Sequence, residues 1–170
     1  MNRFWVTAGA ILAAIIAQVA FAPHVALLGV VPCFPVLVVI TLAVVEGPEV
    51  GAVSGFAGGL ALDLLGTSPV GVWALVLVVV GYLAGLLQEN IFAEGWLMPV
   101  TVAIVAGILA ELSYLVVLQV LGSGPAFWQS VWTVVLPRAV YNTVLALLLY
   151  PWLARFLRSD RSMKSFRRFA

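Results

Sequence analysis

The sequence predicts an all-α fold of a polytopic integral membrane protein, a bundle of six transmembrane helices. The first observation is composition, because 64% of the 170 residues are hydrophobic and only 9% are charged, whereas soluble domains carry about 25% charged residues. The second is that the apolar runs are continuous, which favours spanning helices over the alternating strands of a barrel. The third is a net charge of only +1, which indicates no nucleic-acid partner.

Proline, glycine and charged residues divide the chain into apolar runs. Helices are predicted over residues 4–22, 34–45, 50–65, 70–87, 96–121 and 132–157. The first loop is rich in proline, and the turn at 46–49 contains Pro48, which suits the first turn of the third helix. Breaker or polar residues at 66–69, 88–90 and 122–125 separate the later helices. Residues 1–157 are therefore expected to form a single transmembrane domain.

The first apolar run also fits a secretory signal. Arg3 precedes it, and Ala20-Phe-Ala22 is a small-x-small cleavage pattern. The apolar part is longer than the core of a typical signal. The run is therefore expected to remain as the first transmembrane helix.

The distribution of lysine and arginine predicts the orientation. Arg3 precedes the first run, and the loops 23–33, 66–69 and 122–131 contain neither residue type. Because basic residues accumulate on the cytoplasmic side, an even number of helices places both termini in the cytoplasm. Segment 158–170 is then a basic cytoplasmic tail, which is expected to enforce the topology and bind anionic lipid, with docking to a cytoplasmic partner as the alternative. The basic residues that would bind lipid are Arg155, Arg158, Arg161, Lys164, Arg167 and Arg168.

A stripe of glycines predicts a helix-packing surface. Gly51, Gly55 and Gly59 repeat every four residues in the third run, and Gly107 holds a similar place in the fifth. Small residues at this spacing let two helix backbones approach closely in a bilayer. In each of these two runs the pattern of small residues leads to an acidic residue. The likeness of the two runs is explained either by ordinary helix packing or by an internal duplication.

Three ionisable residues fall inside predicted helices: Asp63, Glu111 and Arg138. Charges at such depth cost at least about 2.5–3.5 kcal/mol each and usually pair. Residue counts from the helix ends place all three in the outer half of the bilayer, so Arg138 is expected to neutralise one acid or both, with Asp63 as the closer partner. Asn142, one turn beyond Arg138, is expected to bond across helices. This predicted polar cluster is either a structural ion pair or part of a proton or substrate path.

Catalytic and metal chemistry has little support in the sequence. Cys33 and His24 are the only cysteine and the only histidine, so neither a disulfide nor a Cys-based metal site is expected. An aspartyl membrane peptidase needs two paired aspartates, and Asp63 is the only aspartate in a predicted helix. The chain is therefore expected to be no enzyme, with no catalytic residue, cofactor or metal site.

Several short motifs occur in order from the second predicted helix to the end of the chain. They are Pro35-Val-Leu-Val-Val, Gly51-x-x-x-Gly55-Phe-x-x-Gly59-Leu-x-x-Asp63-Leu-Leu, Pro69-Val-Gly71, Gly81-Tyr-Leu and Pro137-Arg-Ala-Val-Tyr-Asn142. An apolar run and a basic tail follow the last motif. This ordered set resembles the rod shape-determining MreD family. The residues that carry the resemblance are Pro35, Gly55, Gly59, Asp63, Pro69, Gly71, Pro137 and Asn142.

The resemblance implies a non-enzymatic scaffold subunit of the bacterial cell-elongation machinery, which makes peptidoglycan during rod-shaped growth. Such a subunit lies in the bacterial cytoplasmic (inner) membrane. Members of the family partner the single-span protein MreC, and through it RodA, its class B penicillin-binding protein and MreB. The family's fold resembles the substrate-binding subunits of energy-coupling-factor vitamin transporters, so such a subunit is the alternative function. Against the alternative, short outer loops offer few polar groups for recognising a vitamin.

Overall fold

The computed structural model describes residues 3–26, 30–67, 69–90, 97–145 and 148. Every regular element in this part of the chain is a helix, which confirms the all-α prediction. The predicted tail 158–170 lies outside the described residues, as do the end of the last predicted helix and the basic residues from Arg155 to Arg168.

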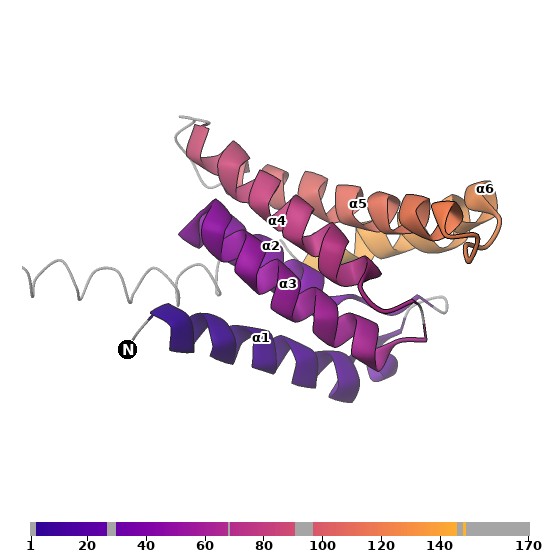
Figure 1. The fold of residues 1–170 in the computed structure, drawn as a ribbon, viewed down its shortest axis with the longest axis horizontal. Helices are drawn as coiled ribbons and strands as arrows, with labels where there is room; N and C mark the ends of the chain where they lie inside the picture. Colours follow the sequence, from indigo (N-terminus) through magenta and orange to yellow (C-terminus); the bar gives the residue numbers. More distant parts are fainter. Residues whose placement is uncertain (1–2, 27–29, 68, 91–96, 146–147, 149–170) are drawn as a thin grey trace, which may run out of the picture.

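The helices follow the predicted apolar runs (Figure 1). In chain order they are α1 (Arg3–Ala20), the short 3-10 helix η1 (Ala22–Val25), α2 (Phe34–Glu46), α3 (Pro48–Leu65), α4 (Val72–Asn90) and α5 (Leu97–Val120). The last helical stretch begins with α6 (Phe127–Ser130), passes through a π-helical turn, η2 (Val131–Val135), and continues over 136–145. It starts at Phe127 rather than at the predicted Trp132, with Ala126 as the capping residue after Pro125.

α2 is the central helix of the bundle. It contacts α1, α3, α4 and α5, and Val36, Leu42 and Ala43 are fully buried. A helix that is apolar on every side is the pattern expected where other helices surround it. Gly47, with a φ of 104°, makes the tight turn into α3, a left-handed conformation that glycine adopts without steric cost. The shortest predicted run is therefore a core helix.

The glycine stripe of α3 packs against α4, the most extensive contact in the bundle. A Cβ added at Gly55 would collide with the backbone of Leu77. One added at Gly51 would collide with the backbone of Gly81, and Gly59 is closed in by the α4 backbone in the same way. Only a residue without a Cβ allows this approach, so the stripe sets the distance between the two helices.

Gly107 on α5, which was expected to be a helix-packing position like the glycines of α3, is less closely packed than they are. A Cβ at this position of α5 would meet Ile40 Cδ1 at 3.9 Å, an ordinary van der Waals distance. A side chain, and not a neighbouring backbone, lies opposite it. The position therefore tolerates alanine, and the expectation of a close backbone approach at Gly107 is wrong.

One helix in the described part of the chain is by itself long and apolar enough to cross a membrane, the segment Val100–Val120 of α5. Shorter apolar helices cover Trp5–Ala20, Phe34–Glu46 and Val72–Gln88. The 13 residues of α2 extend about 20 Å at 1.5 Å per residue, less than the hydrocarbon thickness of about 30 Å. The arrangement of six spans therefore stays a prediction from the sequence.

Candidate functional site

Asp63, only 1% exposed, holds the beginning of α4. Its Oδ2 accepts hydrogen bonds from the backbone N–H groups of Gly71 (2.9 Å) and Ala74 (3.0 Å). Its Oδ1 accepts one from the N–H of Trp73 (3.0 Å). The first N–H groups of a helix have no partner within the helix and form the positive end of its dipole. The carboxylate is therefore satisfied by backbone, and it fixes the turn between α3 and α4.

Arg138 pairs with Glu111. Its Nη1 donates a hydrogen bond to Glu111 Oε2 at 3.2 Å, and the carboxylate of Glu111, on α5, is buried. The expectation that Asp63 is the closer partner of Arg138 is wrong, because the backbone of α4 already occupies both Asp63 oxygens. Residue counts place a side chain along the bundle axis but do not give its direction around that axis.

An irregular helical turn precedes Arg138. The N–H of Leu136 donates to the carbonyl of Val131, five residues earlier, which is the π-helical pattern. Pro137 follows, and it explains the wide turn, since proline has no N–H to donate and its ring crowds the carbonyl four residues before it. Turns of this kind are rare in proteins as a whole, and those that occur are often found at functional sites. The side chain of Arg138 thus projects from the last helical stretch three residues after the π-helical turn ends at Val135.

Two amide side chains fix the segment that leads into α2. Asn142 Oδ1 accepts a hydrogen bond from the N–H of Cys33 at 3.2 Å. Gln18 on α1 uses both ends of its amide, donating to the carbonyl of Pro32 (3.1 Å) and accepting from the N–H of Phe34 (2.9 Å). The segment is therefore held between α1 and the last helical stretch.

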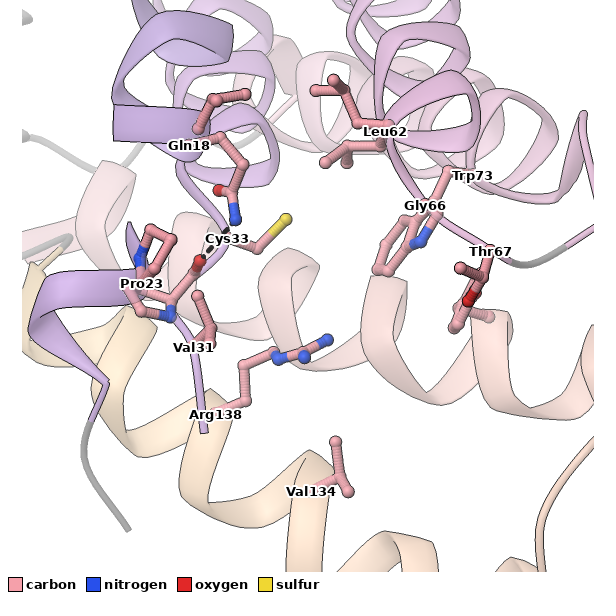
Figure 2. Close-up of a pocket in the computed structure, with 14 residues that line it drawn as sticks. Gln18, Pro23, Val31, Cys33, Leu62, Gly66, Thr67, Trp73, Val134 and Arg138 are labelled. Atoms are coloured by element: carbon pink, nitrogen blue, oxygen red, sulfur yellow. Dashed lines mark hydrogen bonds between the residues drawn. The ribbon is translucent and has the colours of Figure 1, made fainter. Parts of the chain in front are cut away.

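These elements surround a cavity of about 640 Å³ at one end of the bundle (Figure 2). Trp73 and Tyr114 form an apolar wall, with ring centroids 4.1 Å apart and planes 15° from parallel. Arg138 is the only charged side chain among the described lining residues. Figure 2 shows its guanidinium reaching from the last helical stretch into the space between Cys33 on one side and Gly66 on the other.

The polar cluster retains hydrogen-bonding capacity. Glu111 Oε1, Arg138 Nε and Asn142 Nδ2 are buried and have no hydrogen-bond partner among the described residues. Buried polar atoms are nearly always paired with protein or water. The cluster therefore contains two donor atoms and one acceptor atom that no described residue satisfies.

The structure brings the predicted site residues together in two places. Glu111, Arg138 and Asn142 meet near the beginning of α2, whereas Asp63 lies at the α3–α4 turn with Gly71, whose φ of 103° requires glycine-like freedom. The motif prolines begin or interrupt helices: Pro35 is buried in the first turn of α2, Pro69 precedes α4, and Pro137 follows the π turn.

Sequence reasoning missed three contributors to the cavity, namely Gln18, Trp73 and Tyr114. A glutamine near the end of an otherwise apolar helix was the available indication for the first. Nothing in the spacing of the two aromatic residues indicates that they stack. Among the described residues, no group of three His, Cys, Asp or Glu side chains is placed to hold a metal ion.

Residues 1–160 match the family model described as rod shape-determining protein MreD. The comparison with curated proteins gave no match, and neither did the comparison with solved structures. The matched region includes every helix described above and all the motif residues from Pro35 to Asn142. The chain therefore belongs to the rod shape-determining protein MreD family, a family of membrane proteins.

Proposed function

We propose that the chain is a non-enzymatic scaffold subunit of the bacterial cell-elongation machinery, and that it acts by binding an MreC-like single-span partner in the cytoplasmic membrane. Family membership gives the role in rod-shape determination. The proposed addition is that the chain holds another protein in place and does not transform a substrate. Through this partner we expect RodA, its class B penicillin-binding protein and MreB to join the assembly.

The orientation of the bundle supports a partner that reaches the cavity from outside the cytoplasm. In the proposed topology of six spans, Arg3 and the basic residues after the last helix keep both termini cytoplasmic. The cavity walls include Pro32, before α2, and Thr67, after α3. Both lie in segments without lysine or arginine. The cavity then faces the extracytoplasmic side.

The observation that carries the proposal is that the cavity is preformed. Gln18 and Asn142 hold the segment before α2, and Asp63 holds the turn after α3, all through hydrogen bonds to backbone. A site whose walls are already ordered loses less conformational freedom when a partner binds. Its lining combines a flat aromatic wall with one cation, a combination that suits a protein segment with mixed side chains.

A substrate-binding subunit of a vitamin transporter is the second candidate, because a cavity of about 640 Å³ falls within the range of about 300–1,000 Å³ for small-molecule sites. The lining polar groups argue against it. Both ends of the Gln18 amide hold the loop. Beside Arg138, the polar groups of the described lining are then the hydroxyls of Thr67 and Tyr114, the indole N–H of Trp73 and the thiol of Cys33, and Arg138 alone among them is charged. Specific recognition of a vitamin normally uses several convergent polar groups.

Co-purification separates the two functions. The full chain is co-expressed with the MreC-like protein of the same genome, each with its own affinity tag, and the pair is extracted in mild detergent. A scaffold co-elutes with this partner through two affinity steps and gel filtration, whereas an unrelated single-span protein with the same tag does not. Absence of the complex, together with a rise in the melting temperature of the chain on adding a vitamin, would contradict the scaffold and support the transporter subunit.

A further inference from the structure

Arg138 is incompletely paired among the residues that the structure describes. A guanidinium has five N–H donors in a planar fork and binds a carboxylate best through two parallel hydrogen bonds. Here one bond is made within the described part of the chain, from Nη1 to Glu111 Oε2, and Nε has no partner. The side chain is 24% exposed, and its guanidinium reaches into the cavity (Figure 2). Because Nε is buried, the donors that Arg138 keeps for a second acceptor on the cavity side are the Nη N–H groups not used by Glu111, in the 24% of the side chain that is exposed.

No negative charge opposes an anion within the described lining of the cavity. Glu111 is buried and is not among the residues that line the space. Gln18 and Thr67 are neutral, and the carboxylate of Asp63 is bonded to the backbone at the beginning of α4. A group with an oxyanion that enters the cavity thus meets one cation, in surroundings where charge pairs are stronger than in water.

The surroundings favour a protein carboxylate over the phosphate of a lipid. A lipid would need an apolar track that continues from its headgroup site. The apolar groove of about 310 Å³ between α4 and α5 is lined on α4 from Val80 to Leu87 and on α5 from Val102 to Leu109. It lies beyond Trp73 and Tyr114 towards the other end of both helices. Trp73 and Tyr114 instead offer the apolar wall on which neighbouring side chains of a peptide can pack.

We propose that an acidic side chain of the partner enters this cavity and binds Arg138, which makes the cavity a receptor for a carboxylate-bearing protein segment. The inference rests on the proposed scaffold function and adds the chemistry by which the partner is recognised. Arg138 then joins the internal carboxylate of Glu111 to an external one, so that its free donors are filled only in the complex.

The test measures the affinity of the MreC-like partner for the full chain held in phosphatidylcholine nanodiscs. Arg138→Gln alone would strand the buried carboxylate of Glu111, so the informative variant is the neutral pair Arg138→Gln with Glu111→Gln. It should weaken partner binding at least about tenfold, the loss that corresponds to about 1.4 kcal/mol. Glu111→Gln alone, which frees the cation, should bind the partner as tightly as the parent or more tightly. The control Thr143→Val, whose hydroxyl bonds only within its own helix, should leave binding unchanged.

A double-mutant cycle identifies the acid. Each aspartate and glutamate of the partner outside its span is replaced by Asn or Gln and titrated against the parent and against the neutral pair. One replacement should weaken binding to the parent and have no further effect on the neutral pair, because coupled sites are non-additive. If the parent binds the partner but no acid is coupled to Arg138, the inference is overturned and the scaffold function stands. If the parent fails to bind the partner at all, both are overturned.

A lipid arm completes the test. Native mass spectrometry compares retention of phosphatidylglycerol by the parent and by the neutral pair. Equal retention is expected. Loss of phosphatidylglycerol from the neutral pair, with unchanged affinity for the partner, would overturn the inference in favour of a lipid headgroup.

Discussion

Replacing Gly55 by alanine should force α3 away from α4. The added Cβ would lie 2.6 Å from the carbonyl carbon of Leu77 and 2.9 Å from the nitrogen of Val78, with the carbonyl oxygen of Leu77 closer still. Ordinary contact begins at 3.4 Å, so the carbonyl carbon alone requires the two backbones to separate by about 0.8 Å, and the nearer oxygen requires more. All three opposing atoms are backbone atoms, and no change of rotamer can relieve the collision.

The expected loss follows from that separation. A gap of about 0.5–1 Å removes about a quarter to a half of the dispersion energy between facing atoms, and overpacking typically costs about 1–3 kcal/mol. Alanine regains about 1 kcal/mol of helix propensity relative to glycine. Because backbone opposes backbone, we place the cost near the upper end, with a net loss of about 1–2 kcal/mol in the free energy of unfolding.

Gly107→Ala is the matched control, since the same change on α5 puts a Cβ at 3.9 Å from a flexible side-chain end. Thermal unfolding of both full-length variants and the parent in one detergent provides the comparison. Gly55→Ala should melt below the parent, and Gly107→Ala at or above it. Equal shifts in the two variants, or a Gly55→Ala variant as stable as the parent, would show that the α3–α4 contact does not depend on glycine at position 55.

Three further predictions concern the charged groups. Asp63→Ala leaves three N–H groups at the beginning of α4 without their acceptor, and each that stays buried and unpaired costs about 1–3 kcal/mol. Limited proteolysis should therefore cut the 66–71 turn faster in the variant, and cleavage at the parent rate would contradict this. Arg138→Leu alone should lower the melting temperature more than the double variant Arg138→Leu with Glu111→Leu, because an unpaired buried charge costs about 3–5 kcal/mol. Strictly additive losses would mean that the two residues are not coupled. Deleting 158–170 should weaken cosedimentation with anionic vesicles by about 1 kcal/mol per basic residue, and unchanged binding across a salt series would exclude a lipid role for the tail.

The helices could be predicted from the sequence because hydropathy and chain breakers act locally. The turn at 46–49 and the breakers at 66–69 place the ends of α2 and α3 within a few residues of the observed ends. The beginning of α4 is less local. It lies at Val72 and not at Val70, because the carboxylate of Asp63, from the preceding helix, binds the N–H groups of Gly71 and Trp73.

The candidate site was predictable only in part, since its contacts depend on the direction of each side chain around the bundle. Residue counts correctly placed Glu111 and Arg138 close enough to pair, yet could not separate Glu111 from Asp63 as the partner of Arg138. The close approach of Gly55 to α4 follows from its spacing, whereas Gly107 has similar spacing and faces only a side chain. Spacing identifies candidates, and the tertiary arrangement decides which of them touch.

The shape of living cells shows whether this cavity is the surface through which the protein maintains rod shape. The parent chain and its MreC-like partner are expressed in a rod-shaped bacterium depleted of its own MreD family member, and cell length and width are measured by microscopy, with immunoblots to match membrane levels. The parent and Thr143→Val should restore rods. The neutral pair Arg138→Gln with Glu111→Gln should reach the membrane at the same level and leave the cells round, because the cavity has lost its only described cation. Rods of normal width with the neutral pair would contradict the claim that this cavity is the working surface of the scaffold.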